Sequence, residues 1–248
     1  MLNNISNRCL SKPVGILCWL LLLLSISSQA GAEIREASGN FGGLDVRYRV
    51  ILPDNYNPEL TYPTILHFAG GSQTWNIVER STDSDWRAKA EQDGYIVISP
   101  ASPNGELYFQ GADRIFPDFL NYILETYPVA GNKLHLTGHS NGGLSAFHIA
   151  SLYPDYFISL TGYPGLLNGS SNSALEALRP LCIFMHVGDR DPGWRSGMQS
   201  QYQALLARDY RIQFQVESDQ THRLDVSKNQ LRERLFAELE QARQGCAD

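Results

Sequence analysis

The residues of this chain best suited to covalent chemistry are the Gly-His-Ser-Asn-Gly stretch at 138–142. Apolar residues at 134–137 predict a strand before it, and residues 144–152 predict a helix after it. Glycines at both ends of a tight strand-to-helix turn leave room for the backbone and place the Ser140 hydroxyl at the tip. Because the following helix directs backbone N–H groups toward developing negative charge, Ser140 is predicted to be a nucleophile that attacks a carbonyl carbon.

A serine nucleophile needs a base and an acid that orients the base, and in this architecture both follow the serine along the chain. The apolar run 181–187 is followed by Asp191, and the run 212–216 is followed by His222. Both residues then lie at the carboxyl ends of predicted strands, where parallel sheets bind their ligands. The sequence therefore predicts a catalytic triad of Ser140, Asp191 and His222, with an ordinary surface-loop histidine as the alternative for His222.

Two acidic residues leave the strand that precedes the predicted acid. Pro192 biases Asp191 toward an extended backbone and so favours a single position of its carboxylate. Asp189 follows Gly188 directly and is expected to hydrogen-bond backbone amides of its own turn. On these grounds Asp191, rather than Asp189, is predicted to orient His222.

Negative charge on the carbonyl oxygen requires hydrogen-bond donors, and one of them is expected in the loop after an early strand. Here that loop is His-Phe-Ala-Gly-Gly-Ser at 67–72, and its glycines let the backbone approach a bound acyl group closely. The predicted oxyanion hole consists of the N–H groups of Ala69 and Asn141, with Gly70 as an alternative to Ala69. A glycine-rich turn without a catalytic role is the other interpretation of this loop.

The remaining aromatic and histidine residues give weaker signals. Trp75 and Trp194 are expected on loops near these motifs, where they form either an apolar or sugar-stacking wall for the substrate or a cover for the core. His186 lies inside a predicted strand and is expected to be a hydrogen-bonded core residue. His135 and His139 lie across a strand and a turn, so they do not predict a zinc site. No phosphate-binding loop or dinucleotide fingerprint is found, and no metal or cofactor is expected.

Strands and helices alternate along the chain, as expected for a doubly wound α/β domain. The alternation of apolar residues with Arg47 and Arg49 predicts a half-exposed antiparallel strand at 46–50. The segment 163–180 is too short for a separate cap domain. Continuous apolar runs predict parallel strands buried on both faces at 64–68, 95–99, 133–137, 156–161, 181–187 and 212–216. Helical patterns lie near 81–93, 113–126, 142–153, 173–179, 196–209 and 225–243.

The composition is that of an ordinary globular protein. Of the 248 residues, 43% are hydrophobic and 19% are charged, which excludes a disordered, collagenous or coiled-coil chain. The formal net charge is −6 with no block of like charges, so no nucleic-acid partner is expected. The length suits one large domain, which we predict to span residues 33–248.

The first 32 residues have the pattern of a secretory signal peptide. Two basic residues precede an apolar run at 14–24, and the small residues that follow suit cleavage after Ala30 or Ala32. The apolar run is shorter than the ~20 residues that span hydrocarbon, so no stable membrane insertion is expected after cleavage. The alternatives are an uncleaved membrane anchor and, less favoured, a lipid anchor at Cys18. The protein is therefore expected to be secreted or periplasmic.

Four cysteines are too few for a disulfide scaffold. Cys182 and Cys246 remain after removal of the signal peptide. In an oxidising compartment they either pair with each other or stay as a buried thiol and a free thiol on the C-terminal tail.

The chain resembles α/β-hydrolases of the secreted esterase group, which includes polyhydroxybutyrate depolymerase-like proteins and feruloyl and acetyl xylan esterases. The resemblance rests on residues 48–53, 67–71, 137–143, 153–157 and 188–192. It implies an α/β-hydrolase fold, and its Gly-x-x-Asp-Pro pattern also assigns the acid to Asp191. The chain departs from the family pattern in two places. The usual His-Gly of the oxyanion loop is His67-Phe68, and the glycine common before the catalytic histidine is Thr221.

These observations together predict an enzyme that cleaves carboxylic esters through an acyl-enzyme intermediate, with an ester substrate as its partner. Without a cap domain the site is expected to be open, which permits bulky or polymeric esters such as polyhydroxyalkanoates or acyl groups linked to polysaccharides. Two other functions are compatible with the same residues: a secreted serine peptidase of the same fold, and a catalytically inactive binding protein.

Overall fold

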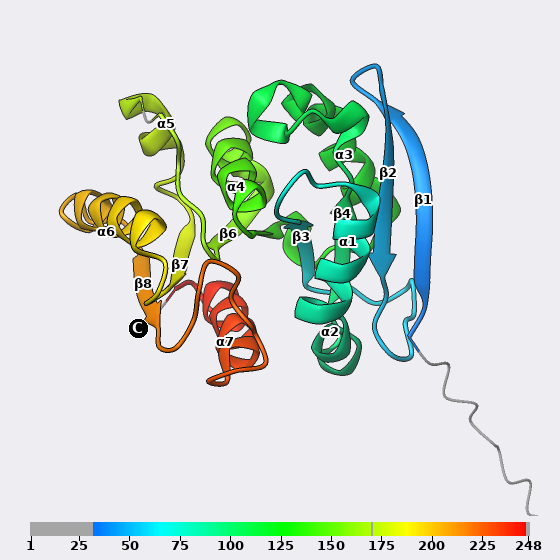
Figure 1. Cartoon of the computed structure of the whole chain (residues 1–248). Helices are drawn as coiled ribbons and strands as arrows, with labels where there is room; N and C mark the ends of the chain where they lie inside the picture. Colours follow the sequence, from blue (N-terminus) through cyan, green and yellow to red (C-terminus); the bar gives the residue numbers. More distant parts are fainter. Residues whose placement is uncertain (1–31, 170, 247–248) are drawn as a thin grey trace, which may run out of the picture.

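An eight-stranded sheet runs through the part of the chain that the computed structural model describes, residues 32–169 and 171–246 (Figure 1). The predicted signal peptide, 1–32, lies outside these residues except for its last position. The strand order is β1-β2-β4-β3-β5-β6-β7-β8, in which β3 to β8 run parallel and β2 pairs antiparallel with both β1 and β4. The strands are β1 Ile34–Phe41, β2 Leu44–Ile51, β3 Thr64–Phe68, β4 Ile96–Pro100, β5 Leu134–Gly138, β6 Phe157–Gly162, β7 Cys182–Gly188 and β8 Ile212–Glu217.

Residues of the central strands alternate between the two faces of the sheet. Leu66 of β3 packs in a large apolar cluster with residues of α3, α4 and α6, whereas its neighbour Ile65 packs with Trp86 and residues of α7. Helices therefore cover both faces, which confirms the predicted α/β class with a mostly parallel sheet (Figure 1). The helices are α1 Trp75–Ser81, α2 Ala88–Asp93, α3 Phe116–Thr126, α4 Asn141–Leu152, α5 Asn172–Ala177, α6 Pro192–Leu206 and α7 Leu231–Arg243.

Burial of the strands follows their position in the sheet. Strands β3, β4, β5 and β7 are buried along their whole length, as predicted for strands covered on both faces. Strand β8 lies at the edge of the sheet, and its residues Gln213 and Gln215 are exposed. The prediction of burial on both faces is therefore wrong for β8.

The other edge of the sheet differs from the prediction in two respects. Strand β1 is not predicted, because most of its residues are polar or small and Phe41 is its one buried residue. In β2, Arg47 is exposed as expected but Arg49 is buried. The Arg49 guanidinium donates to Asp83 Oδ1 and to Thr82 Oγ1, each at 2.8 Å, because the helical segment after β3 covers it.

Two helices have unexpected boundaries. A π-helical segment, Thr82–Arg87, joins α1 to α2, so the helix expected near 81–93 begins earlier and is interrupted. The helix expected from residue 225 begins only at Leu231. The cause is a local turn in which Asp225 Oδ1 accepts the Ser227 N–H at 3.0 Å, an arrangement that competes with a helix.

Cys182 and Cys246 form a disulfide with their Cα atoms 5.8 Å apart, which decides between the two expectations for these cysteines. The bond joins β7 to the segment after α7. Within the described residues, no helix combines the length and the apolar character needed to cross a membrane.

Candidate active site

The turn at 138–142 joins β5 to α4, as the sequence predicts. Ser140 at its tip has φ 57° and ψ −120°, a conformation that a non-glycine residue adopts only under strain. The Ser140 N–H donates to the Pro164 carbonyl oxygen at 2.8 Å, which helps to hold this conformation. A Cβ atom on Gly138 would lie 2.1 Å from the carbonyl oxygen of Gly142, so the turn is too tight for a side chain there.

Ser140, His222 and Asp191 form a continuous row of hydrogen bonds. Ser140 Oγ lies 2.8 Å from His222 Nε2, and His222 Nδ1 lies 2.7 Å from Asp191 Oδ2. The three residues follow the carboxyl ends of β5, β8 and β7, at one edge of the sheet. The Asp191 side chain is 12% exposed and the His222 side chain 42%, so the acid is sheltered while the histidine is open to a substrate. This row can remove the serine proton and stabilise the resulting imidazolium.

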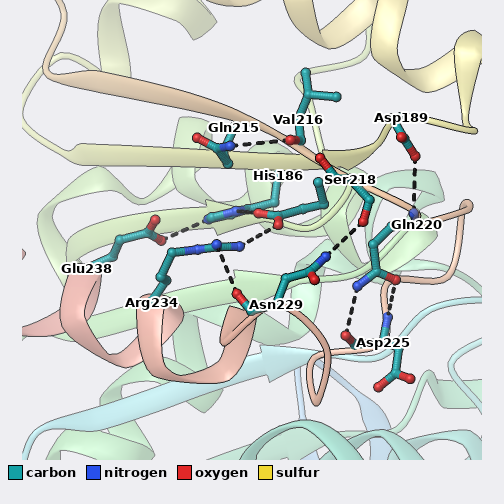
Figure 2. A network of polar contacts seen from close by, with 11 residues as sticks. His186, Asp189, Gln215, Val216, Ser218, Gln220, Asp225, Asn229, Arg234 and Glu238 are labelled. Atoms are coloured by element: carbon teal, nitrogen blue, oxygen red, sulfur yellow. Dashed lines mark hydrogen bonds and ion pairs between the residues drawn. The ribbon is translucent and has the colours of Figure 1, made fainter.

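Asp189 contacts the loop that carries His222. Its two carboxylate oxygens accept the N–H groups of Asp219 and Gln220, each at 3.1 Å. Figure 2 shows the bond to Gln220. The prediction that Asp189 bonds amides of its own turn is therefore wrong, because the free N–H groups nearest to it belong to the loop after β8. Asp189 fixes the beginning of that loop.

The loop after β8, which carries His222, is also held by hydrogen bonds between its own residues and by one from the segment before α7. Gln220 Nε2 donates to the Asp225 carbonyl oxygen at 2.9 Å, and Gln220 Oε1 accepts the Asp225 N–H at 3.0 Å. Asn229 Nδ2 donates to the Ser218 carbonyl oxygen at 2.8 Å (Figure 2). These bonds close the loop on both sides of His222 and limit the positions that its ring can take.

His186 of β7 is buried behind this loop, between two carboxylates (Figure 2). Its Nδ1 lies 2.9 Å from Glu217 Oε1, its Nε2 lies 3.0 Å from Glu238 Oε2, and Arg234 also contacts Glu217. Burial alone would lower the pKa of His186, but the two glutamates outweigh burial and raise that pKa to about 9. His186 is a hydrogen-bonded core residue, as predicted. Its ion pairs with Glu217 and Glu238 connect the end of β8 to α7.

The loop after β3 lies directly against the turn at Ser140. A Cβ atom on Gly142 would lie 2.0 Å from the Phe68 carbonyl oxygen, so the two backbones touch. Asn141 Nδ2 also donates to the Gly71 carbonyl oxygen at 2.9 Å. Ala69 is buried in this loop, and Asn141 is the first residue of α4, where backbone N–H groups lack helical acceptors. The predicted donors thus belong to two segments in contact.

In the loop after β3, His67-Phe68 stands where the esterases that the chain resembles usually have His-Gly. The two glycines of this loop, Gly70 and Gly71, are still present. His67 is buried, with Nε2 2.7 Å from Ser81 Oγ and Nδ1 3.0 Å from Thr137 Oγ1. Burial lowers the pKa of His67 to about 3, so its ring is neutral. Phe68 packs in the core, and the glycines that approach the site follow at 70 and 71.

Trp75 is the first residue of α1 and Trp194 lies in the first turn of α6, so the prediction that both lie on loops is wrong. The Trp194 ring centroid lies 5.4 Å from that of His222. Trp75 packs against the apolar cluster of Ala69 and Val78, and the Arg47 guanidinium lies 3.6 Å above its ring. Substrate contact remains a prediction for both residues, and Trp194 is the one beside the row of Ser140, His222 and Asp191.

A pocket of about 230 Å³ beside His139 has no counterpart among the sequence predictions. Its polar lining includes Arg80, Asp85 and Arg223. Arg223 follows His222 directly, and this adjacency is the one sequence signal that points to it. Arg80 and Asp85 come from α1 and the π-helical segment, and only the folded chain brings them here.

Within residues 32–169 and 171–246, no group of three or more His, Cys, Asp or Glu side chains is arranged to hold a metal ion. The histidines near the turn have other contacts. His135 Nδ1 lies 2.8 Å from Ser159 Oγ, and His139 Nε2 lies 3.3 Å from the His222 carbonyl oxygen.

Known proteins provide an independent comparison. The sequence model of a family described as "Putative esterase" matches residues 40–244. Feruloyl esterase B of Talaromyces funiculosus is 24% identical over 163 residues, which cover 61% of this chain and 44% of that protein. Probable acetylxylan esterase A of Neosartorya fischeri is 23% identical over 239 residues, which cover 86% of this chain and 63% of that protein. The chain thus spans less than two thirds of the length of either relative.

Among solved structures, a ferulic acid esterase superposes with a TM-score of 0.69 at 19% sequence identity. The match covers 85% of this chain and 99% of that one. At this level of identity the similarity shows a common fold for the two chains.

Proposed function

Because the chain belongs to the putative esterase family and has the α/β-hydrolase fold, we propose that it hydrolyses carboxylic esters with Ser140 as nucleophile. The observation that carries this proposal is the row in which His222 lies 2.8 Å from Ser140 Oγ and 2.7 Å from Asp191. His222 takes the hydroxyl proton as Oγ attacks the ester carbonyl, and Asp191 stabilises the imidazolium. The imidazolium then protonates the leaving alcohol, and His222 activates the water that hydrolyses the acyl-enzyme.

The negative charge that develops on the carbonyl oxygen needs donors beside Ser140. We assign this role to the N–H groups of Ala69 and Asn141, with Gly70 as the alternative in the loop after β3. The close backbone contact between that loop and α4 supports the assignment. Each such donor contributes about 3 kcal/mol to transition-state stabilisation in comparable sites.

We further propose that the acyl group is carried by a bulky or polymeric alcohol. Between β6 and β7, where a cap domain would have to be inserted, the described residues contain one short helix, α5, which leaves room for a large substrate. Trp194 lies beside His222 and offers a surface for an apolar or sugar ring. The names of the relatives, a feruloyl esterase and an acetylxylan esterase, favour polysaccharide-linked acyl groups over polyhydroxyalkanoates.

We also propose that the protein is secreted or periplasmic after removal of its predicted signal peptide. The Cys182–Cys246 disulfide supports this location, because disulfides form and persist in oxidising compartments.

Covalent labelling tests the nucleophile directly. A fluorophosphonate probe should label the wild-type protein at Ser140, and Ser140→Ala should abolish labelling while the protein keeps its melting temperature. The same substitution should lower kcat on a 4-nitrophenyl ester by about 10⁴-fold or more, since triad members act as a unit. Retention of a tenth of wild-type turnover by the folded variant would show that another residue is the nucleophile.

A substrate panel then separates ester from peptide chemistry. We expect turnover of short 4-nitrophenyl esters, feruloylated sugars or acetylated xylan, and none of peptide anilides. Cleavage of peptide anilides without ester turnover would assign a serine peptidase, and the absence of both labelling and turnover would assign an inactive binding protein.

A further inference from the structure

Three parts of the proposed reaction centre, namely Ser140, His222 and the loop after β3, have a neighbour in the wall of the 230 Å³ pocket. Gly70 comes from the loop after β3, His139 directly precedes Ser140, and Arg223 directly follows His222. Helix α1 and the π-helical segment close the remaining side. A substrate whose ester carbonyl lies at Ser140 therefore has this pocket beside it.

The carboxylate in the pocket lining is already occupied by bonds within the protein. Asp85 Oδ1 accepts the Ser84 hydroxyl at 2.6 Å, and Asp85 Oδ2 accepts the hydroxyls of Tyr163 at 3.1 Å and Ser81 at 3.4 Å. Tyr163 also receives the indole N–H of Trp86 at 3.1 Å, so Asp85 belongs to a network that extends into the core. Little acceptor capacity is left on Asp85 for a ligand.

The two arginines of the lining have unused donors. Among the described residues, neither Arg80 nor Arg223 forms a salt bridge, although many other arginines, such as Arg87 and Arg179, are paired with glutamates. The charge of Arg223 acts on Asp85 without a direct ion pair and opposes the effect of burial on the pKa of that carboxyl group. The Arg80 Nε donates to the Asn76 carbonyl oxygen at 3.2 Å, and its terminal nitrogens have no protein acceptor in the described part of the chain. Both residues are exposed and line the pocket, so their guanidinium groups are free to bind a further acceptor.

The balance of charge in the pocket is positive. Burial lowers the pKa of His139 to about 4, so that ring is neutral near pH 7. Burial also raises the pKa of Asp85, which favours its neutral form as the pH falls. The pocket lining thus contains two arginines and one internally bonded carboxyl group, in a chain whose formal net charge is −6. A local excess of donors and positive charge favours an anionic ligand over a neutral polyol.

We propose that this pocket binds a carboxylate on the substrate, in either its acyl or its alcohol half, through Arg80 and Arg223. The proposal rests on ester hydrolysis at Ser140. A guanidinium fork matches a carboxylate in geometry and can donate two parallel hydrogen bonds to it. Ile77 and Leu224 form the apolar part of the wall, which suits the short hydrocarbon chain or ring that links such a carboxylate to the ester.

The test compares pairs of esters in which one member carries a free carboxylate and the other carries the neutral methyl ester of that carboxylate. For the alcohol half the pair is 3-acetoxybenzoate and its methyl ester, and for the acyl half it is mono-4-nitrophenyl adipate and its methyl ester. In the double variant Arg80→Gln/Arg223→Gln we expect kcat/KM for the anionic member of at least one pair to fall by about tenfold or more, as for loss of charge-assisted hydrogen bonds. The value for the neutral member should stay within about twofold.

A variant with the same change in net charge controls for long-range attraction. Arg35→Gln/Arg208→Gln removes two exposed guanidinium groups outside the pocket and should leave both members of each pair unchanged. Equal losses in the two double variants, or equal effects on the charged and neutral esters, would overturn the carboxylate site. If the neutral esters are turned over and Ser140 is labelled, such a result refutes the pocket alone. If Ser140 is not labelled and no ester reacts, the proposed function itself fails.

Discussion

Asp191 Oδ2 lies 2.7 Å from His222 Nδ1, although the two residues are 31 positions apart in the chain. Asp189, two residues earlier, holds the same loop through the N–H groups of Asp219 and Gln220. The two acids at the end of β7 therefore have different partners. One contacts the imidazole ring, and the other contacts the backbone that carries it.

This difference predicts different outcomes for the same chemical change. Asp191→Asn should lower kcat by up to about 10⁴-fold at nearly constant melting temperature, because an amide stabilises the wrong tautomer of His222. Asp189→Asn should mainly cost stability, on the order of 1 kcal/mol for a lost hydrogen bond. Measurement of kcat and of the melting temperature for both variants checks this assignment, which is wrong if the folded Asp189→Asn protein is the inactive one.

The close contact between Gly142 and the loop after β3 predicts an effect of one methyl group. In Gly142→Ala the new Cβ atom would lie 2.0 Å from the Phe68 carbonyl oxygen, so backbone must move. We expect a loss of about 3 kcal/mol in stability and of about 10²-fold in kcat/KM, because the Ala69 amide moves with its loop. Gly193→Ala in α6 is the matched control, since nothing lies within 4 Å of its Cβ position. Equal stability of the two variants in urea unfolding would contradict the close approach.

The charged His186 predicts a loss of stability at alkaline pH. Its pKa is raised to about 9 by Glu238 and Glu217 in the folded chain, whereas a histidine in an unfolded chain titrates near ~6.5. Between about pH 6.5 and 9, His186 therefore carries a proton in the folded state that it has lost in the unfolded state. This proton contributes up to about 3 kcal/mol to the free energy of unfolding. The contribution is complete below about pH 6.5 and is lost as the pH rises through about 9. Urea unfolding at a series of pH values between these limits measures this loss.

A variant without the charges controls for other titrating groups. His186→Leu combined with Glu217→Gln and Glu238→Gln should unfold with much less dependence on pH over the same range. A wild-type stability that stays constant between neutral and alkaline pH would refute the ion-paired state of His186.

The disulfide predicts a contribution to stability that depends on the loop it closes. Cys182 and Cys246 are 64 residues apart, and loss of a bond across a loop of this size typically costs about 2–4 kcal/mol. We expect the double variant Cys182→Ala/Cys246→Ser to show this loss without reductant and to be insensitive to dithiothreitol. The wild-type protein should lose the same amount only when it is reduced. Equal unfolding curves for the wild-type protein with and without reductant would argue against the bond.

The sequence alone predicts those structural features that depend on residues close together in the chain. The strand at 64–68 and the turn that places Ser140 between β5 and α4 both follow from local spacing. Strands covered on both faces leave long apolar runs, and a tight turn requires glycine. For the same reason the polar edge strand β1 and the exposed face of β8 were harder to recognise, because their side chains are only partly buried.

Contacts between distant segments were decided by the tertiary structure. Hydrogen-bonding residues such as Asp189 and Arg49 take whichever partner the packed chain brings within about 3 Å, and sequence distance carries no information about that partner. The disulfide between Cys182 and Cys246, and the presence of Arg80 and Arg223 in the lining of one pocket, likewise depend on the packing of segments that are far apart in the chain. The sequence alone determined which residue types follow the ends of the strands and so which chemistry to expect, whereas the fold determined which side chains surround Ser140, because those distances are set by packing.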